Sequence, residues 1–466
     1  MPTTTLTLTG VQHDLLRAHL FPGDGREAAA VLICSRVPPP RLRLLVRDIV
    51  VIPHNVCRRE RDAINWPGNY IEDAIDRAED ESLSLILIHS HPGGLFGFSR
   101  MDDESDQLTL GGVFQAFGDR HGSAIMTADG AIRARLYEPD LVSLPIELVT
   151  VAGHDLNYWW EIDARQLGAA TPRPIAFTHG MREELGRLSA ALIGVSGTGS
   201  VVGEQLGRLG LGSVRLIDYD CVEHRNLNRI LNATRSDADR RRLKVEMFAD
   251  AIKVHRGDGV AQAVAASVAT REAVLSASQS DLLFCCVDTL EARQIADLLS
   301  AAFLLPLFDV GVVVPMRKAG DGVAIADVCG RLDYVQPGRS TLQDRGVYTA
   351  ASLRAEYLRR TAPDAHKAEV DAGYIRGLLE EAPAVITLNM RAGSALVNEF
   401  IARAYPFRLE SNSRYARTEF SLAACEEEFT PEQSFPVTEN PMLGRGACEP
   451  LLGLPVLAPL RTGVHR

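Results

Sequence analysis

The sequence predicts an α/β protein with two folded domains and an irregular C-terminal tail. Two observations lead to this prediction. From residue 177 onward, short apolar segments alternate with amphipathic ones, and a stretch rich in Pro, Gly and small residues separates this region from an earlier group of apolar segments. Alternating strands and helices are typical of a doubly wound sheet. The length of 466 residues also suits more than one domain.

The first domain is predicted over residues 1–150. Three apolar segments have the length and composition of strands, and they cover residues 28–36, 43–52 and 83–89. Between the second and third, the sequence INWPGNYIEDAIDRAEDE reads as a turn that leads into a helix.

The second domain is predicted over residues 177–408, after a linker or arm at 151–176. Its predicted strands are SAALIGV (189–195), VRLIDYD (214–220), DLLFCCVD (281–288) and PLFDVGVVV (306–314). Its predicted helices are VVGEQLGRLG (201–210), RRRLKVEMFADAIKVH (240–255) and LEARQIADLLSAAFL (290–304). Residues 409–466 show no helical or strand period, so we expect an irregular tail there.

Composition excludes several classes of protein. The net charge of −11 argues against nonspecific nucleic-acid binding, which needs a basic face. No apolar stretch approaches the roughly 20 residues of a membrane helix, and the N-terminus lacks the features of a secretory signal. Eight scattered cysteines without a C-x-x-C pair fit a reduced, cytoplasmic protein rather than a disulfide framework.

A candidate metal site follows the third apolar segment. His89 and His91 are two residues apart, so on a strand they point to the same face. Asp102 can supply a third, oxygen ligand, which leaves the fourth tetrahedral position open for a water molecule, as in catalytic zinc sites. Glu27 is the candidate carboxylate to take a proton from that water. Ser99 with Asp102 also fits a helix capping box, and each of these residues alone has an ordinary structural interpretation.

Together, H-S-H-P, a seven-residue gap and S-x-x-D resemble the signature of the JAB/JAMM (MPN) zinc isopeptidases. The resemblance implies an α+β domain with a mixed sheet. It also implies that His89, His91 and Asp102 bind Zn²⁺, that Glu27 is the general base and later the general acid, and that Ser99 supports the oxyanion. Enzymes of this family cleave the bond after the C-terminal Gly of ubiquitin-like proteins.

A candidate nucleotide site follows the strand at 189–195. Its small residues allow backbone N–H groups to approach phosphates, and the helix behind the turn directs its positive end to an anion. The turn contains Gly194, Ser196, Gly197, Gly199 and Ser200. By itself, such a turn favours a generic NAD or flavin domain.

The next strand favours ATP. The sequence DYDCVEHRNLNR resembles the D-x-D-x-V-x-x-x-N-L-x-R motif of the ThiF/MoeB-like activating enzymes, which include the ubiquitin-activating enzymes. This resemblance implies a Rossmann-like domain that adenylates the C-terminal Gly of a ubiquitin-like protein. The residues that it implies for ATP and Mg²⁺ are Asp218 at the ribose, Asn226, Arg229 and Lys244 at the phosphates, and Asp288 at the magnesium ion. Asp220 is a further expected nucleotide-binding residue.

The family also implies an arginine from outside the motif, and the sequence departs from the family pattern at two places. An arginine from an N-terminal arm often completes the site, and Arg173 is the first candidate here and Arg182 the second. The second Gly of the usual G-x-G-G-x-G turn is Ser196, and residues 337–344 lack the zinc-binding C-x-x-C pair of many relatives. No acyl acceptor is obvious, so the default is transfer of the adenylate without an acyl-enzyme. Cys448 is the candidate thiol, and Ser340 or Thr341 the candidate hydroxyl.

The two resemblances imply a bifunctional enzyme of a ubiquitin-like pathway. The expected partners are a β-grasp modifier, a conjugating enzyme and a second copy of the chain, because activating enzymes of this family form homodimers. Such fusions resemble bacterial systems that conjugate ubiquitin-like proteins to targets, some of which act in phage defence. Two alternatives stay open: processing and activation of a sulfur-carrier protein, and a scaffold that docks the modifier without catalysis.

Overall fold

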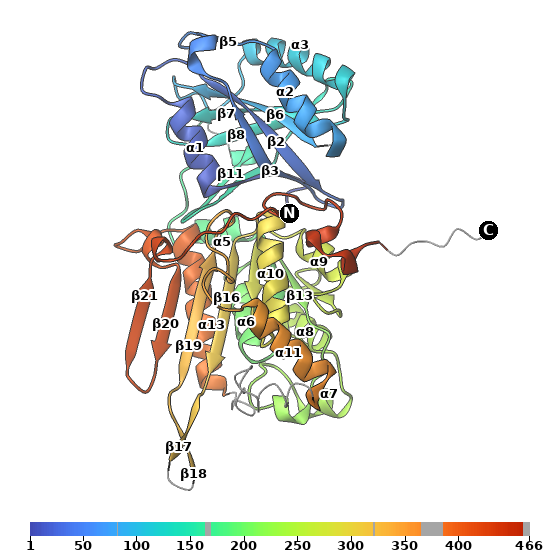
Figure 1. Ribbon diagram of the computed structural model, residues 1–466, viewed down its shortest axis with the longest axis vertical. Helices are drawn as coiled ribbons and strands as arrows, with labels where there is room; N and C mark the ends of the chain where they lie inside the picture. The colour runs from blue at the N-terminus through green and yellow to red at the C-terminus, as the bar shows by residue number, and fades with distance from the viewer. Residues whose placement is uncertain (82, 164–168, 320–321, 365–384, 460–466) are drawn as a thin grey trace, which may run out of the picture.

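A computed structural model shows two domains, each built on its own sheet, with the C-terminal segment running along the seam between them (Figure 1). The structure describes residues 1–81, 83–163, 169–319, 322–364 and 385–459. The predicted linker therefore contains a stretch, residues 164–168, that lies outside the described residues. No helix of the described part of the chain is long and apolar enough to cross a membrane.

The first domain has a mixed, nine-stranded sheet. Its spatial order is β11 (Leu156–Trp160), β10 (Leu148–Ala152), β1 (Thr4–Thr9), β3 (Leu42–Val51), β2 (Ala29–Val37), β6 (Ser84–His91), β7 (His121–Thr127), β8 (Ile132–Tyr137) and β9 (Ser143–Pro145). The domain also contains α1 (Gly10–Leu20), α2 (Asn69–Ala78), α3 (Arg100–Ala116) and a small ladder of β4 (Arg58–Arg59) and β5 (Ile64–Asn65). The mixed sheet agrees with the expected α+β fold. However, β11 extends this sheet ten residues beyond the predicted boundary at residue 150, because β10 turns back and pairs with it.

The second domain has an eight-stranded sheet with a parallel half. Its order is β14 (Ala261–Val264), β13 (Ser213–Ile217), β12 (Ser189–Ile193), β15 (Leu282–Cys285), β16 (Leu307–Val313), β19 (Cys329–Val335), β20 (Arg417–Ser421) and β21 (Glu426–Thr430). The first five strands are parallel and the last three are antiparallel. From β12 the chain adds β13 and β14 on one side, and then returns to add β15 and β16 on the other side. This order confirms the doubly wound fold, and it creates a switch point at the carboxyl end of β12, where the strand order reverses.

Helices cover both faces of this sheet. Because successive side chains of a strand point to opposite faces, β12 contributes Leu192 to one core and Ile193 to the other. Helices α6 (Gly197–Leu209), α8 (Lys244–Arg256) and α13 (Ile386–Ala404) pack on the first face, and α9 (Arg271–Ala277) and α10 (Leu290–Phe303) on the second. The domain also contains α5 (His179–Leu185), α7 (Arg235–Asp239), α11 (Ala350–Thr361) and the hairpin of β17 (Met316–Ala319) and β18 (Gly322–Ile325).

The C-terminal segment is more ordered than predicted. Instead of an irregular tail from residue 409, the chain forms the β20–β21 hairpin, which extends the second sheet. Only Thr418 and Phe420 of β20 are buried, so the alternating pattern is too short to stand out in the sequence. After β21 the chain is irregular, with three-residue turns at Glu432–Ser434, Leu451–Gly453 and Pro455–Leu457.

The irregular part of this segment connects the two domains. The amide of Gly444 donates to the carbonyl oxygen of Ala301 in α10 at 3.0 Å, and its own carbonyl oxygen accepts from the hydroxyl of Ser35 in β2 at 2.6 Å. A Cβ atom at residue 444 would lie 3.0 Å from the backbone of Arg47, and the residue has a φ of +66°. Glycine is therefore the residue that fits this crossing.

Two arginines of the first domain anchor it to the amino-terminal end of the second sheet. The guanidinium of Arg41 pairs with the buried carboxylate of Asp281, just before β15, at 2.5 Å. Arg43 donates to the carbonyl oxygen of Ser278 at 2.6 Å and to that of Phe303 at 3.2 Å. The first domain thus sits where the parallel strands begin, opposite the end where they finish.

Replacing Arg43 by Ala is expected to destabilise the protein by about 2–4 kcal/mol. Arg43 is 2% exposed, and its loss would leave the carbonyl groups of Ser278 and Phe303 buried without these donors. The midpoint of urea denaturation, followed by fluorescence, measures the effect. The matched control is Arg58→Ala, because Arg58 forms an exposed pair with Glu60 that contributes about 0–1 kcal/mol. Equal midpoints for both variants would contradict an anchoring role.

Candidate active sites

The predicted zinc residues lie together at the end of β6. His89 and His91 project from the same face of this strand, and their Nε2 atoms are 3.0 Å apart. Asp102, in the first turn of α3, brings Oδ1 to 3.1 Å from His89 Nε2 and Oδ2 to 3.6 Å from His91 Nε2. Two nitrogen ligands of one tetrahedral zinc ion lie roughly 3.3 Å apart, given Zn–N bonds near 2.05 Å. The spacing of these side chains therefore suits one zinc ion.

The protonation of His91 also suits metal binding. Its Nδ1 lies 2.8 Å from the carbonyl oxygen of Leu95, which can only accept a hydrogen bond. The ring therefore carries a proton on Nδ1, and Nε2, which faces Asp102 and His89, is the nitrogen that a metal ion could take once its own proton is lost. A backbone partner of this kind fixes the orientation of metal-binding histidines.

Glu27 reaches the same cluster from the residues just before β2. One of its carboxylate oxygens lies within 4.8 Å of ring nitrogens of His89 and His91. Burial raises the pKa of Glu27 to about 7, although both imidazoles oppose the shift. Burial would also raise the pKa of Asp102, but its hydrogen bonds with the two histidines hold that pKa well below its usual range. The cluster thus pairs one carboxylate that stays ionised with one that can exchange a proton near neutral pH.

Ser99 caps the helix that carries Asp102. Its hydroxyl accepts from the backbone N–H of Asp102 at 3.2 Å, and Asp102 Oδ2 accepts from the N–H of Ser99 at 2.5 Å. The capping box that the sequence allowed is therefore present, and it aims the Asp102 carboxylate at the histidines. The hydroxyl proton of Ser99 is not used in this box, so the predicted role at the oxyanion stays a prediction.

The Gly-rich turn occupies the switch point after β12. Gly194 has a φ of +85°, and a Cβ on Gly199 would lie 1.8 Å from the carbonyl oxygen of Gly194. Both positions thus require glycine. Helix α6 begins directly behind the turn, and the side chain of its N-cap residue, Ser196, makes no capping hydrogen bond. Its first N–H groups are therefore available to an anion. Ser200 lies within the helix, where its hydroxyl donates to the carbonyl oxygen of Gly197.

Acidic and basic side chains surround this turn at the carboxyl end of the sheet. Asp218, after β13, accepts from the N–H groups of Val195 at 2.8 Å and Asp220 at 2.9 Å. Burial raises its pKa, against the effect of Lys244. The buried ammonium of Lys244 lies 2.7 Å from Asp220 Oδ2. The structure therefore brings three of the predicted nucleotide residues into one hydrogen-bonded group beside the turn.

The remaining predicted residues lie at the same end of the sheet. Asn226 is buried, and its side-chain oxygen accepts from the N–H of Glu223 at 3.0 Å. Arg229 places its Cδ 3.3 Å from the position that a Cβ of Gly197 would take. Asp288 lies three positions after the last residue of β15 and is exposed.

The two candidate arm arginines lie elsewhere. The guanidinium of Arg173 donates to the side chain of Asn157 and approaches Asp155 to 3.9 Å, both beside the first sheet. Arg182, in α5, packs against Gly210. Neither contacts the Gly-rich turn of its own chain. An active-site role for Arg173 would therefore depend on a second subunit, and a homodimer stays a prediction.

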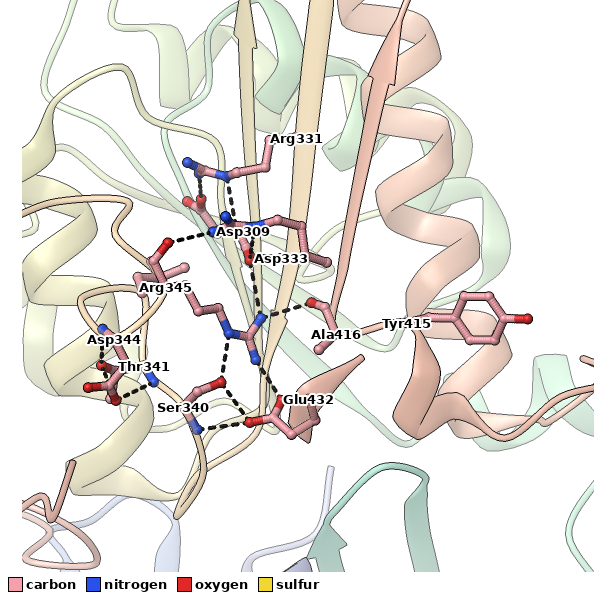
Figure 2. A network of polar contacts seen from close by, with 12 residues as sticks. Asp309, Arg331, Asp333, Ser340, Thr341, Asp344, Arg345, Tyr415, Ala416 and Glu432 are labelled. Carbon is pink, nitrogen blue, oxygen red and sulfur yellow. Dashed lines mark hydrogen bonds and ion pairs between the residues drawn. The ribbon is translucent and has the colours of Figure 1, made fainter. Parts of the chain in front are cut away.

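The candidate hydroxyl acceptors lie at the end of the second sheet opposite the Gly-rich turn. They follow Val335, which pairs with the first residue of β16 and so lies at the amino-terminal end of the parallel strands. Ser340 is 0% exposed, and its hydroxyl donates to Glu432 at 2.6 Å and accepts from Arg345 at 2.9 Å (Figure 2). Thr341 donates to Asp344 at 2.9 Å. The structure therefore brings neither Ser340 nor Thr341 to the nucleotide turn, and the hydroxyl-acceptor hypothesis has no support from this arrangement.

Cys448 lies at the same end. The segment around it is bound to the end of α10 through the N–H of Gly446, which donates to the carbonyl oxygen of Ala302 at 2.8 Å. Burial and the nearby carboxylate of Glu81 raise the pKa of the Cys448 thiol. A raised thiol pKa lowers the thiolate fraction. The structure therefore does not support Cys448 as an acceptor in this arrangement.

One residue beside the nucleotide turn was missed by sequence reasoning. Asn389, in the first turn of α13, accepts a hydrogen bond from the hydroxyl of Thr198 at 3.1 Å. It is 191 positions away in the chain and belongs to no motif. Its sequence neighbours give no local signal, because an isolated Asn in an apolar helix is an ordinary observation.

Family models match both domains of the chain. The model of the prokaryotic homologues of the JAB domain matches residues 11–137, and the model of the ThiF family matches residues 172–402. The first match covers the His89, His91 and Asp102 cluster, and the second covers the Gly-rich turn and every predicted nucleotide residue.

Curated relatives are similar to part of the chain. The chain is 28% identical to the ubiquitin-like modifier-activating enzyme 5 of Caenorhabditis elegans over 169 residues, which cover 34% of this chain and 37% of that protein. The corresponding enzyme of Culex quinquefasciatus is 24% identical over 42% of this chain and 50% of its own length. That of Xenopus laevis is 24% identical over 55% and 66%. The chain thus spans between about a third and two-thirds of these relatives.

Solved structures give weaker similarities. Escherichia coli MccB is similar with a TM-score of 0.42 and 16% identity, over 56% of this chain and 68% of that chain. PaaA is similar with a TM-score of 0.39 and 15% identity, over 55% and 76%.

Proposed function

Because the chain joins a domain of the prokaryotic JAB homologues to a domain of the ThiF family, we propose that it both activates and releases a ubiquitin-like modifier. The second domain would adenylate the C-terminal Gly of a β-grasp protein with ATP and Mg²⁺. The first would cleave a precursor or conjugate of the same modifier with Zn²⁺. The observation that carries the proposal is the group of Asp218, Asp220 and Lys244 at the Gly-rich turn, together with a separate histidine cluster.

In adenylation, the modifier's carboxylate attacks the α-phosphate of ATP and pyrophosphate leaves. Asp218 would hold the ribose, so that the α-phosphate stays aligned with the attacking oxygen. Lys244 and Arg229 would stabilise the charge that develops on the phosphates. Asp288 would hold the magnesium ion, which supplies further positive charge to the triphosphate.

In cleavage, a zinc ion bound by His89, His91 and Asp102 would supply a water molecule of lowered pKa. Glu27 would take the proton of this water and later give it to the leaving amine. The pKa of about 7 at Glu27 suits both transfers, because base and acid forms are then both accessible at neutral pH. Ser99 would donate a hydrogen bond to the oxyanion.

ATP–pyrophosphate exchange with the purified chain and a β-grasp protein tests the proposal. We expect exchange that needs both ATP and the modifier. A modifier whose C-terminal carboxylate is converted to an amide is the control, because it retains the docking surface but loses the reacting carboxylate. If the intact modifier binds and exchange is still absent, the second domain serves only as a docking module and adenylation is excluded.

A further inference from the structure

Two helices from distant parts of the chain begin at the same point beside the Gly-rich turn. Two side-chain hydrogen bonds join α6 to α13, one between Thr198 and Asn389 and the other between Gln205 and Ser394. The residue numbers increase in the same direction along both helices, so the two helices are parallel. Their axes approach closely at Gly393, where a Cβ would lie 2.9 Å from Val201. Both amino-terminal ends therefore face the carboxyl end of the sheet, where an anion would gain from both helix dipoles.

Asn389 stands between these two helix ends. Its side chain is 98% buried by the fold, since only 2% of the residue is exposed. The hydroxyl of Thr198 donates to its side-chain oxygen at 3.1 Å, which leaves the amide nitrogen as a donor. Within the described residues, this nitrogen makes no hydrogen bond. It points at Gly197, because a Cβ there would lie 2.3 Å from it.

The geometry points to a phosphate ligand for this amide. Gly197 is the first residue of α6, and the stem of Arg229 flanks it from another side. The amide nitrogen keeps an unused donor, which an acceptor atom of a ligand can take up. Phosphate oxygens accept hydrogen bonds and are attracted to the same helix ends. We propose that Asn389 binds a phosphate group of the ATP held on the Gly-rich turn, an assignment that rests on the proposed function.

Calorimetric titration with ATP and with adenosine tests this assignment. Asn389→Asp preserves the shape of the side chain but sets a carboxylate against the phosphates, so we expect ATP to bind about 50-fold more weakly. Asn389→Ala removes the amide donor, together with the acceptor of the Thr198 hydroxyl, without adding a charge, and is expected to weaken ATP binding about 5–10-fold. Adenosine, which has no phosphate, should bind all variants within about 2-fold. Ser394→Ala is the matched control, since it removes a hydrogen bond between the same two helices away from the turn.

The outcomes separate a ligand contact from a structural role. Selective loss of ATP affinity in both Asn389 variants, with an unchanged melting temperature of the nucleotide-free protein, supports the assignment. Equal weakening of ATP and adenosine, or wild-type affinity for ATP in both variants, overturns it. If the wild-type chain itself binds no ATP, the proposed function fails and this assignment fails with it.

Discussion

Glu27→Gln is expected to retain zinc and to lose about a thousandfold of the cleavage rate. A general base contributes roughly 10²–10⁴-fold to such reactions, and Gln cannot accept the proton. His89, His91 and Asp102 remain in place to bind the metal, since their spacing does not depend on Glu27. Hydrolysis of a modifier fused to a reporter peptide measures the rate, and elemental analysis of the purified variant measures the zinc content.

The matched control is Glu60→Gln. This exposed residue lies beside Glu27, whose N–H donates to the Glu60 carbonyl oxygen at 2.8 Å, so the control makes the same chemical change nearby. We expect near wild-type cleavage from it. If Glu27→Gln loses its zinc along with its activity, Glu27 is a metal ligand and the assigned base role is wrong.

Asp288→Ala is expected to reduce ATP–pyrophosphate exchange by about 10²–10³-fold. The variant removes the carboxylate that would hold magnesium against the triphosphate, and loss of one such electrostatic contact costs about 3–4 kcal/mol in the transition state. Because Asp288 is exposed, its replacement should change the free energy of unfolding by no more than about 0.5 kcal/mol. Loss of exchange would then report on chemistry rather than folding.

Asp258→Ala is the control for this change. Asp258 forms an exposed ion pair with Lys253 at 2.6 Å, after α8 and outside the nucleotide group. Its variant should exchange pyrophosphate at the wild-type rate. Full exchange by Asp288→Ala at saturating magnesium would show that another group holds the metal.

Both candidate sites could be predicted because their residues are close in sequence. His89, His91 and Asp102 lie within fourteen positions on one strand, a loop and a helix start, and Asp218 to Arg229 lie in the stretch that follows β13. Local spacing then fixes which side chains share a face. Glu27 was found despite its distance, because it stands just before the apolar strand that pairs with β6.

Features that depend on distant pairing could not be predicted. Arg41 reaches Asp281 across 240 positions, and nothing in either local pattern indicates the partner. The β20–β21 hairpin was read as irregular, since two buried side chains do not define a period. Asn389 was missed for the same reason: only the packing of α13 on α6 gives it a place beside the turn.

The position of the first domain at the beginning of the parallel strands also bears on how a modifier would travel. The Gly-rich turn lies at the opposite end of β12, whose five residues span about 17 Å, and the histidine cluster lies farther still, inside the other domain. If the proposed function holds, the end of one modifier would therefore lie at only one of the two centres at a time. A modifier released at the histidine cluster would have to leave the first domain before the Gly-rich turn could take it up again.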